Sequence, residues 1–139
     1  MAAAAIALGT TVIDRPEDEV MLVLRHVIRA IRARWPRVEI LIRGDSHYAR
    51  HEAMTWCEHN QVGYVFGLAG NQVLLGKVAA LAEDAALGRV NGEGEKVRRF
   101  GEFGYAAKSW KVARRVIGRV EASSQGSDSR FVITNLAGT

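Results

Sequence analysis

Cysteine and proline are scarce in this 139-residue chain, which holds one cysteine, Cys57, and two prolines. A single cysteine excludes an internal disulfide and a cysteine-rich zinc site. The chain has 48% hydrophobic and 24% charged residues. Together with the low proline content, this composition indicates a globular chain and not a disordered one. At this length we expect about one domain built around a single core.

Long apolar runs are also missing. The opening MAAAAIALGTTVID is apolar, but it has no basic n-region and is too short to span a bilayer. We therefore expect no signal peptide, no membrane helix and a cytoplasmic location. That location argues against the cell-adhesion tripeptide that Arg43, Gly44 and Asp45 spell, because such a tripeptide acts on an extracellular loop.

Histidine is absent after residue 59. This absence argues against a second interpretation, in which Gly44-Asp45-Ser46 begins the nucleophile motif of a lipolytic serine-hydrolase family. A serine nucleophile needs a general base, normally a histidine held by a carboxylate. The Asp-x-x-His element that this hydrolase family carries near its C-terminus is missing here. His47 is a poor substitute, because neighbouring side chains in an extended segment point to opposite faces.

Two other interpretations of Asp45 remain open from the residues alone. A histidine metal site formed by Asp45, His47 and His51 fits by spacing, although such residues near a strand-to-helix turn are more often plain surface residues. A carboxylate of an α/β active site fits by topology. Asp45 follows a predicted strand and precedes a predicted helix, and reactive groups collect beyond the carboxyl ends of strands in open parallel sheets.

Acidic residues are few where basic residues cluster, and the net charge is +4. The segment 25–37 holds five arginines and no acid, and the segment 87–120 holds nine Lys or Arg against three Glu. Such segments favour a polyanion partner through counterion release, and they fit an ordinary solvated face equally well.

Periodicity predicts helices and strands in alternation. Asp14 and Glu17 have capping-box spacing ahead of an apolar stripe that Pro36 ends, which predicts a helix. Strands are predicted at 38–43 and 63–68, with a helix at 49–60 between them and another helix at 71–87. This order implies a parallel strand pair joined by a right-handed crossover. The predicted core contains Leu41, Val65, Phe66, Leu74 and Val78.

The second half of the chain reads as antiparallel sheet. Trp110, Val112, Val116 and Val120 alternate with basic residues, and RFVITNL at 130–136 is a further strand candidate. If the alternation holds, Lys111, Arg115 and Arg119 share one face of a strand and form a track for a phosphate backbone.

The stretch ILIRGDSHYARHEAMTWCEHNQVGYVFGLAGN resembles the second-aspartate region of DDE transposases of bacterial insertion sequences, in the family numbered thirteen-eighty. RRFGEFGYAAKSWKVARRVIGRVEA and SRFVITNL resemble the inserted strands of that family and the strand that leads to its catalytic glutamate. The resemblance covers roughly residues 20 to 136.

The resemblance implies an α/β fold with a partial ribonuclease-H-like core at 1–88, followed by an antiparallel β insertion and the start of a return strand at 89–139. It implies that Asp45 is the catalytic and metal-binding second aspartate, which shares two Mg²⁺ or Mn²⁺ ions with two further carboxylates. DNA is the implied partner, with Arg43, Lys111, Arg115 and Arg119 as DNA-binding residues. His47, Tyr48 and Arg50 flank the site without an assigned role.

Departures from the family pattern shape the expected function. The opening segment does not resemble the strand that bears the first aspartate, and the chain stops before the segment that bears the glutamate. We therefore expect a transposase fragment that is inactive alone and does not stably bind the metal ions. The rival prediction is a small basic nucleic-acid-binding protein without catalysis, in which Asp45 is structural.

Overall fold

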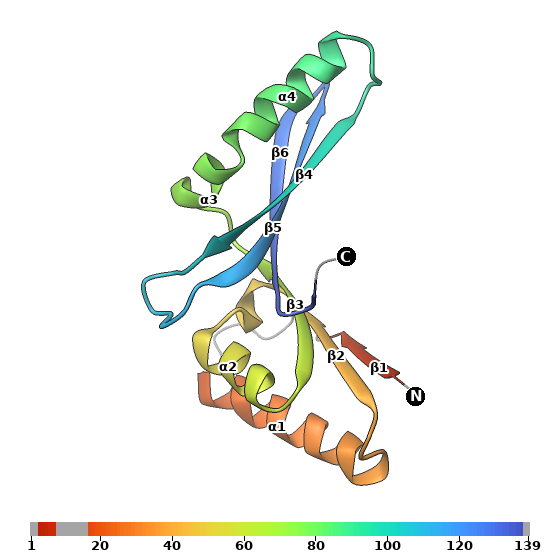
Figure 1. The fold of residues 1–139 in the computed structure, drawn as a ribbon, viewed down its shortest axis with the longest axis vertical. Helices are drawn as coiled ribbons and strands as arrows, with labels where there is room; N and C mark the ends of the chain where they lie inside the picture. Colours follow the sequence, from red (N-terminus) through yellow and green to blue (C-terminus); the bar gives the residue numbers. More distant parts are fainter. Residues whose placement is uncertain (1–2, 8–16, 138–139) are drawn as a thin grey trace.

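The computed structural model describes residues 3–7 and 17–137, with side chains from residue 20 onward, as a six-stranded sheet with helices (Figure 1). The strands are β1 (Ala3–Ala7), β2 (Glu39–Gly44), β3 (Val62–Leu68), β4 (Val97–Tyr105), β5 (Arg114–Ser123) and β6 (Gly126–Thr134). The helices are α1 (Glu17–Arg34), α2 (His51–His59), α3 (Gln72–Lys77) and α4 (Ala79–Val90), with a 3-10 turn, η1 (Ser46–Tyr48).

The strand order in the sheet is β1-β2-β3-β6-β5-β4. β1, β2 and β3 are parallel, and α1 and α2 form the crossovers between them. β4, β5 and β6 are antiparallel, and β6 joins the two parts of the sheet by pairing with β3 on one side and β5 on the other. The predicted fold class, a partial ribonuclease-H-like core followed by antiparallel strands, is confirmed. The predicted order began with a helix, however, and the structure places the strand β1 ahead of α1.

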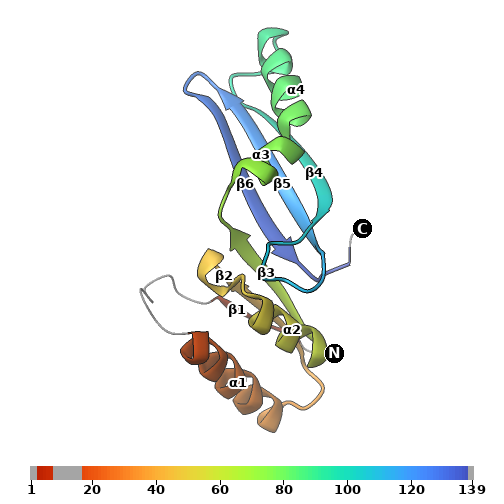
Figure 2. The same cartoon turned by 90° about the vertical axis from the view of Figure 1, so that its left-hand side faces the viewer.

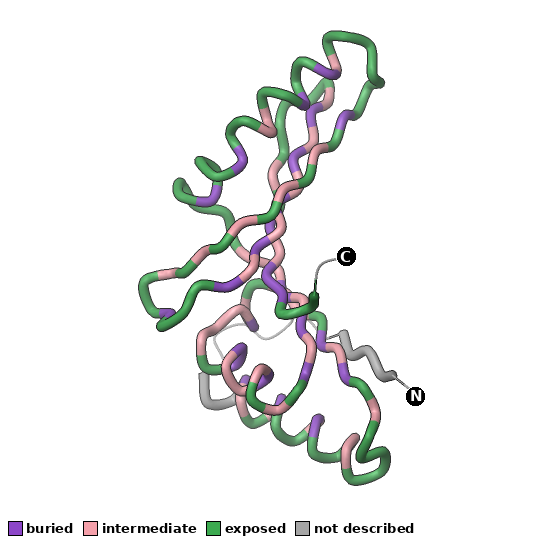
Figure 3. The backbone as a smooth tube through the Cα atoms, viewed as in Figure 1, coloured by how far each residue is buried: buried purple, intermediate pink, exposed green. Residues whose placement is uncertain are grey.

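The described helices pack on one face of the sheet, as Figure 2 shows from that side. Along β5, buried residues alternate with partly exposed ones over the whole strand (Figure 3). The buried set points at the helices, because α4 contacts both β4 and β5. We call the opposite side, which includes Leu41, Val65, Arg115, Arg119 and Val132, the helix-free face of the described sheet.

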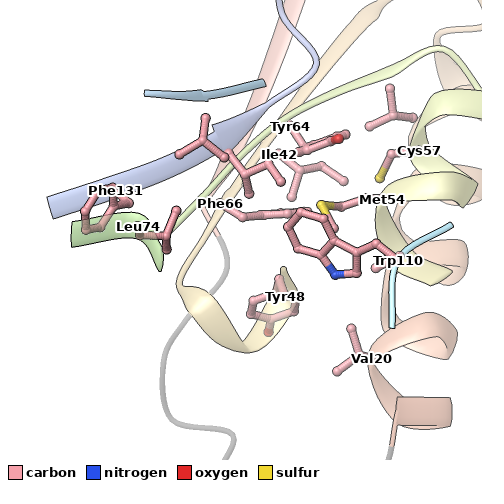
Figure 4. Packing of buried hydrophobic residues seen from close by; sticks show 14 of the residues in the cluster. Val20, Ile42, Tyr48, Met54, Cys57, Tyr64, Phe66, Leu74, Trp110 and Phe131 are labelled. Carbon is pink, nitrogen blue, oxygen red and sulfur yellow. The ribbon is translucent and has the colours of Figure 1, made fainter. Parts of the chain in front are cut away.

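The core lies between the sheet and the helices (Figure 4). The rings of Tyr64 and Phe66 stack with centroids 5.0 Å apart, and Met54 and Cys57 of α2 are fully buried beside them. Of the predicted core residues, Phe66, Leu74 and Val78 are buried. Leu41 and Val65 are only half-buried, because each strand places alternate residues on the helix-free face.

The predicted helix at 71–87 is two helices, because the chain bends at Val78 between α3 and α4. Asn71 starts α3 by accepting a hydrogen bond from the Leu74 N–H at 2.9 Å, as an N-cap residue does. The helix predicted from Asp14 is observed as α1 from Glu17, and Asp14 itself lies outside the described residues. Within the described ranges, no helix has the length and apolarity to cross a bilayer.

Candidate functional site

Asp45 lies immediately after β2, the middle strand of the parallel part, as predicted. Its backbone is extended, and its side chain caps η1, since Oδ1 accepts a hydrogen bond from the His47 N–H at 3.0 Å. The described residues make no hydrogen bond to the other carboxylate oxygen, Oδ2, and the residue is half-buried. The turn therefore fixes the carboxylate by one oxygen and leaves the second available.

Two glycines, Gly44 and Gly67, lie beside this turn. A Cβ at Gly44 would lie 2.8 Å from the Tyr48 ring, so only glycine lets Tyr48 fold back into the core beside Phe66. A Cβ at Gly67 of β3 would lie 3.4 Å from the Ser46 nitrogen. The distance at Gly67 is an ordinary van der Waals contact, so the close packing of this turn depends on Gly44.

A cleft of about 440 Å³ opens at Asp45 and extends over the end of β3 to the first half of β6. Its lining includes a second carboxylate, Asp128, which accepts hydrogen bonds from Arg119 at 3.3 Å and Arg130 at 3.2 Å. Sequence reasoning missed Asp128, because the pairing of β6 with β3 brings it to the cleft. Two arginines offset its charge, so it is first of all an ion-pair residue.

The described residues do not by themselves fit a two-metal centre. Mg²⁺ takes about six oxygen ligands in near-octahedral geometry, usually with carboxylates among them. Among residues 20–137, however, no three His, Cys, Asp or Glu side chains are grouped closely enough to hold an ion. The histidine metal site is likewise not formed, because the His51 ring lies against Arg114 at 3.1 Å.

The residues that flank Asp45 have separate roles. Arg43 is exposed on the helix-free face. Tyr48 belongs to the core, and Arg50 donates from Nε to the His47 carbonyl at 3.0 Å. His47 Nε2 is buried, and no residue within 20–137 forms a hydrogen bond with it.

The predicted basic track is wrong in its geometry. Arg115 and Arg119 do share the helix-free face of β5, but Lys111 precedes the strand, in the connection 106–113. Arg115 is 2.7 Å from Glu102, and Arg119 pairs with Asp128, so carboxylates already neutralise both arginines. Whether these residues touch DNA stays a prediction.

Arg114 is a polar core residue that sequence reasoning also missed. The buried guanidinium donates to both carboxylate oxygens of Glu58, at 2.9 and 3.0 Å, and to the Thr55 hydroxyl at 3.0 Å. It lies over the Trp110 ring, 5.7 Å from the centroid. Its position two residues before Val116, on the apolar parity of β5, could have revealed it.

The electrostatics of this cluster follow from its burial and hydrogen bonds. Burial alone would raise the pKa of Glu58, but hydrogen bonds from Arg114 and Tyr64 outweigh it and hold that pKa below the ordinary 4.5. Burial raises the pKa of Tyr64, and its hydrogen bond to Glu58 at 2.8 Å adds to the rise. Burial, with a smaller contribution from the charge of Glu58, raises the pKa of the Cys57 thiol to about 12.

A carboxylate beside a cleft at the carboxyl edge of parallel strands is the arrangement by which α/β proteins present reactive groups. The chain belongs to the family described as transposase DDE domain group 1, whose model matches residues 5–139. Family membership implies a transposase-related function with DNA as partner, and DDE transposases generally use divalent metal ions. No curated protein and no solved structure matches the chain.

Proposed function

We propose that this chain takes part in the transposition of an insertion sequence of family thirteen-eighty, with Asp45 as a metal-binding carboxylate for phosphodiester chemistry on DNA. The observation that carries the proposal is the available Oδ2 of Asp45, held at the carboxyl edge of β2 beside an open cleft. A hard carboxylate oxygen is the ligand that Mg²⁺ and Mn²⁺ prefer.

The chain alone is proposed to be catalytically incomplete. Among the residues that the structure describes, the cleft offers one available carboxylate, which does not hold two ions in a defined geometry, and Asp128 is occupied by arginines. We therefore expect the purified chain neither to cut nor to join DNA with Mg²⁺ or Mn²⁺. Robust cleavage that disappears on replacement of Asp45 would overturn this expectation.

Weak ion binding at Asp45 is tested by paramagnetic broadening of amide resonances. Titration with Mn²⁺ should broaden the amides of 45–47 first in the unmodified chain. Asp45→Asn should abolish this effect, while its amide oxygen still caps η1. Glu83→Gln is a matched control, since it removes one carboxylate from an exposed site on α4. Equal broadening in Asp45→Asn would show that Asp45 is structural, as the rival nucleic-acid-binding prediction has it.

A further inference from the structure

We propose that the groove between α1, α2 and the connection 106–113 binds the phosphodiester backbone of DNA. We call it the α1–α2 groove; it has a volume of about 710 Å³ and shares no lining residue with the Asp45 cleft. The inference rests on the proposed function in that it takes DNA as the partner. It adds a second contact surface, on the helix-bearing side of the molecule.

Cationic side chains outnumber carboxylates in the lining of the groove. Arg25 of α1, His51 and His59 of α2, and Lys111 of the connection line it, against one carboxylate, Glu52. The hydroxyls of Thr55 and Ser109 add hydrogen-bond donors. His51 and His59 lie two turns apart on one helix, a distance of about 12 Å, which exceeds the spacing of neighbouring phosphates. The groove can therefore follow a backbone as well as hold a single anion.

Arg25 and Lys111 are available to an anion. Both side chains are exposed, and neither forms an ion pair with a residue that the structure describes. The arginines of the β4–β6 region differ, since Arg98, Arg99, Arg115 and Arg119 each pair with a carboxylate. A phosphate can approach Arg25 and Lys111 without displacing an existing partner.

The groove is also preorganised by the buried cluster behind it. Trp110 is buried in a T-shaped contact with Tyr105, with ring centroids 5.4 Å apart, and its neighbours Ser109 and Lys111 line the groove. Arg114 donates to His51 Nδ1 at 3.1 Å. Since a guanidinium cannot accept a hydrogen bond, Nδ1 is the acceptor and the ring proton lies on Nε2. That Nε2 donor lies 3.5 Å from the Thr55 hydroxyl oxygen, so contacts within the cluster fix both nitrogens of the His51 ring.

The test measures the affinity for a fluorescein-labelled DNA duplex by anisotropy over a series of salt concentrations. Each phosphate contact contributes about 0.9 to the magnitude of the slope of log affinity against log salt. We expect the double variant Arg25→Ala with Lys111→Ala to lower that magnitude by about 1.8. Arg37→Ala with Lys96→Ala is the matched control, because it removes two exposed cations outside the groove. This control should lower the magnitude of the slope much less.

The outcomes separate this inference from the proposed function. An unchanged slope in Arg25→Ala with Lys111→Ala, while the chain still binds DNA, overturns the groove and leaves the proposed function standing. A lower slope in Arg115→Ala with Arg119→Ala alone would assign DNA to the helix-free face instead. Failure of the unmodified chain to bind DNA at low salt would contradict both. Far-UV circular dichroism confirms that each exposed-residue variant is folded.

Discussion

At the scale of single residues, the ion pair between Arg114 of β5 and Glu58 of α2 links that helix to the antiparallel strands. The Arg114 side chain is 4% exposed and the Glu58 side chain 31%, so the cation is far less hydrated than its partner. Removing one partner of such a pair is costly, because it leaves the other charge buried without compensation. The pair therefore joins elements that the chain order keeps apart.

Glu58→Gln should destabilise the protein by about 3 kcal/mol at pH 7, the lower end for a buried pair, since Glu58 is partly open to solvent. The same change should also make the free energy of unfolding fall less as the pH is lowered. The folded-state pKa of Glu58 lies below its ordinary 4.5, so its stabilisation is fully present above about pH 4.5 and is lost as the pH falls through the folded-state pKa. Urea unfolding at several pH values measures both effects.

The comparison that decides this prediction is the difference between Glu58→Gln and the unmodified chain at each pH, because other carboxylates titrate equally in both. That difference should shrink below pH 4.5. A difference that stays constant down to low pH would show that the Glu58 charge contributes nothing to folding. Glu83→Gln, on the exposed side of α4, should match the unmodified chain throughout.

At the scale of elements, the approach of α4 to the sheet depends on a missing side chain. A Cβ at Gly118 of β5 would lie 2.8 Å from Val78 Cγ1 and 3.4 Å from the Phe131 ring. Val78 is β-branched and fully buried, so it has little freedom to move aside. The bend between α3 and α4 thus lies where Val78 packs against Gly118 of β5.

Gly118→Ala should therefore destabilise the protein by about 1–3 kcal/mol, as expected for overpacking. Gly104→Ala is its matched control, since Gly104 lies on β4 with no atom within 4 Å of an added Cβ. That control should be neutral or stabilising by up to about 1 kcal/mol, because glycine is unfavourable inside a strand. Thermal unfolding of the two variants compares them directly, and equal melting temperatures would contradict the close-contact argument.

Sequence patterns predicted most helices and strands. They did not predict features that depend on contacts between elements. The short apolar runs VEILIR and GYVFGL predicted β2 and β3, and Pro36 correctly marked the end of α1. A continuous apolar strand does not say which face the helices cover, so Leu41 and Val65 were assigned to the core on hydrophobicity alone. No proline marks the bend at Val78, so the local sequence did not predict it.

The candidate site was predictable only as far as it is local. Asp45 follows a predicted strand, so its place at the sheet edge could be predicted, and it is confirmed. Asp128 and Lys111 could not be placed from the sequence. Strand pairing brings Asp128 to the Asp45 cleft. Lys111 lies at the α1–α2 groove, next to the buried Trp110. Both depend on contacts between distant parts of the chain.

At the scale of the whole molecule, Cys57 is a reporter of folding that the chain already contains. The thiol is fully buried and its pKa is raised to about 12, so almost no thiolate is present at pH 8 in the folded state. We expect Ellman's reagent to leave the native chain unmodified and to label it once denaturant unfolds it. Ser124→Cys, in the exposed β5–β6 turn, should react at once and controls for reagent access. Fast labelling of Cys57 in native buffer would contradict a closed core.

The place of β6 has a consequence for synthesis on the ribosome. β4 and β5 emerge before β6, yet they reach the parallel strands only through it, because β6 lies between β3 and β5. Until β6 leaves the exit tunnel, the nascent chain holds a β4–β5 hairpin and a β1–β3 unit whose β3 edge is unpaired. Such an edge is a template for pairing with other chains, so a nascent chain stalled before residue 126 should recruit chaperones more strongly than one stalled after Thr134.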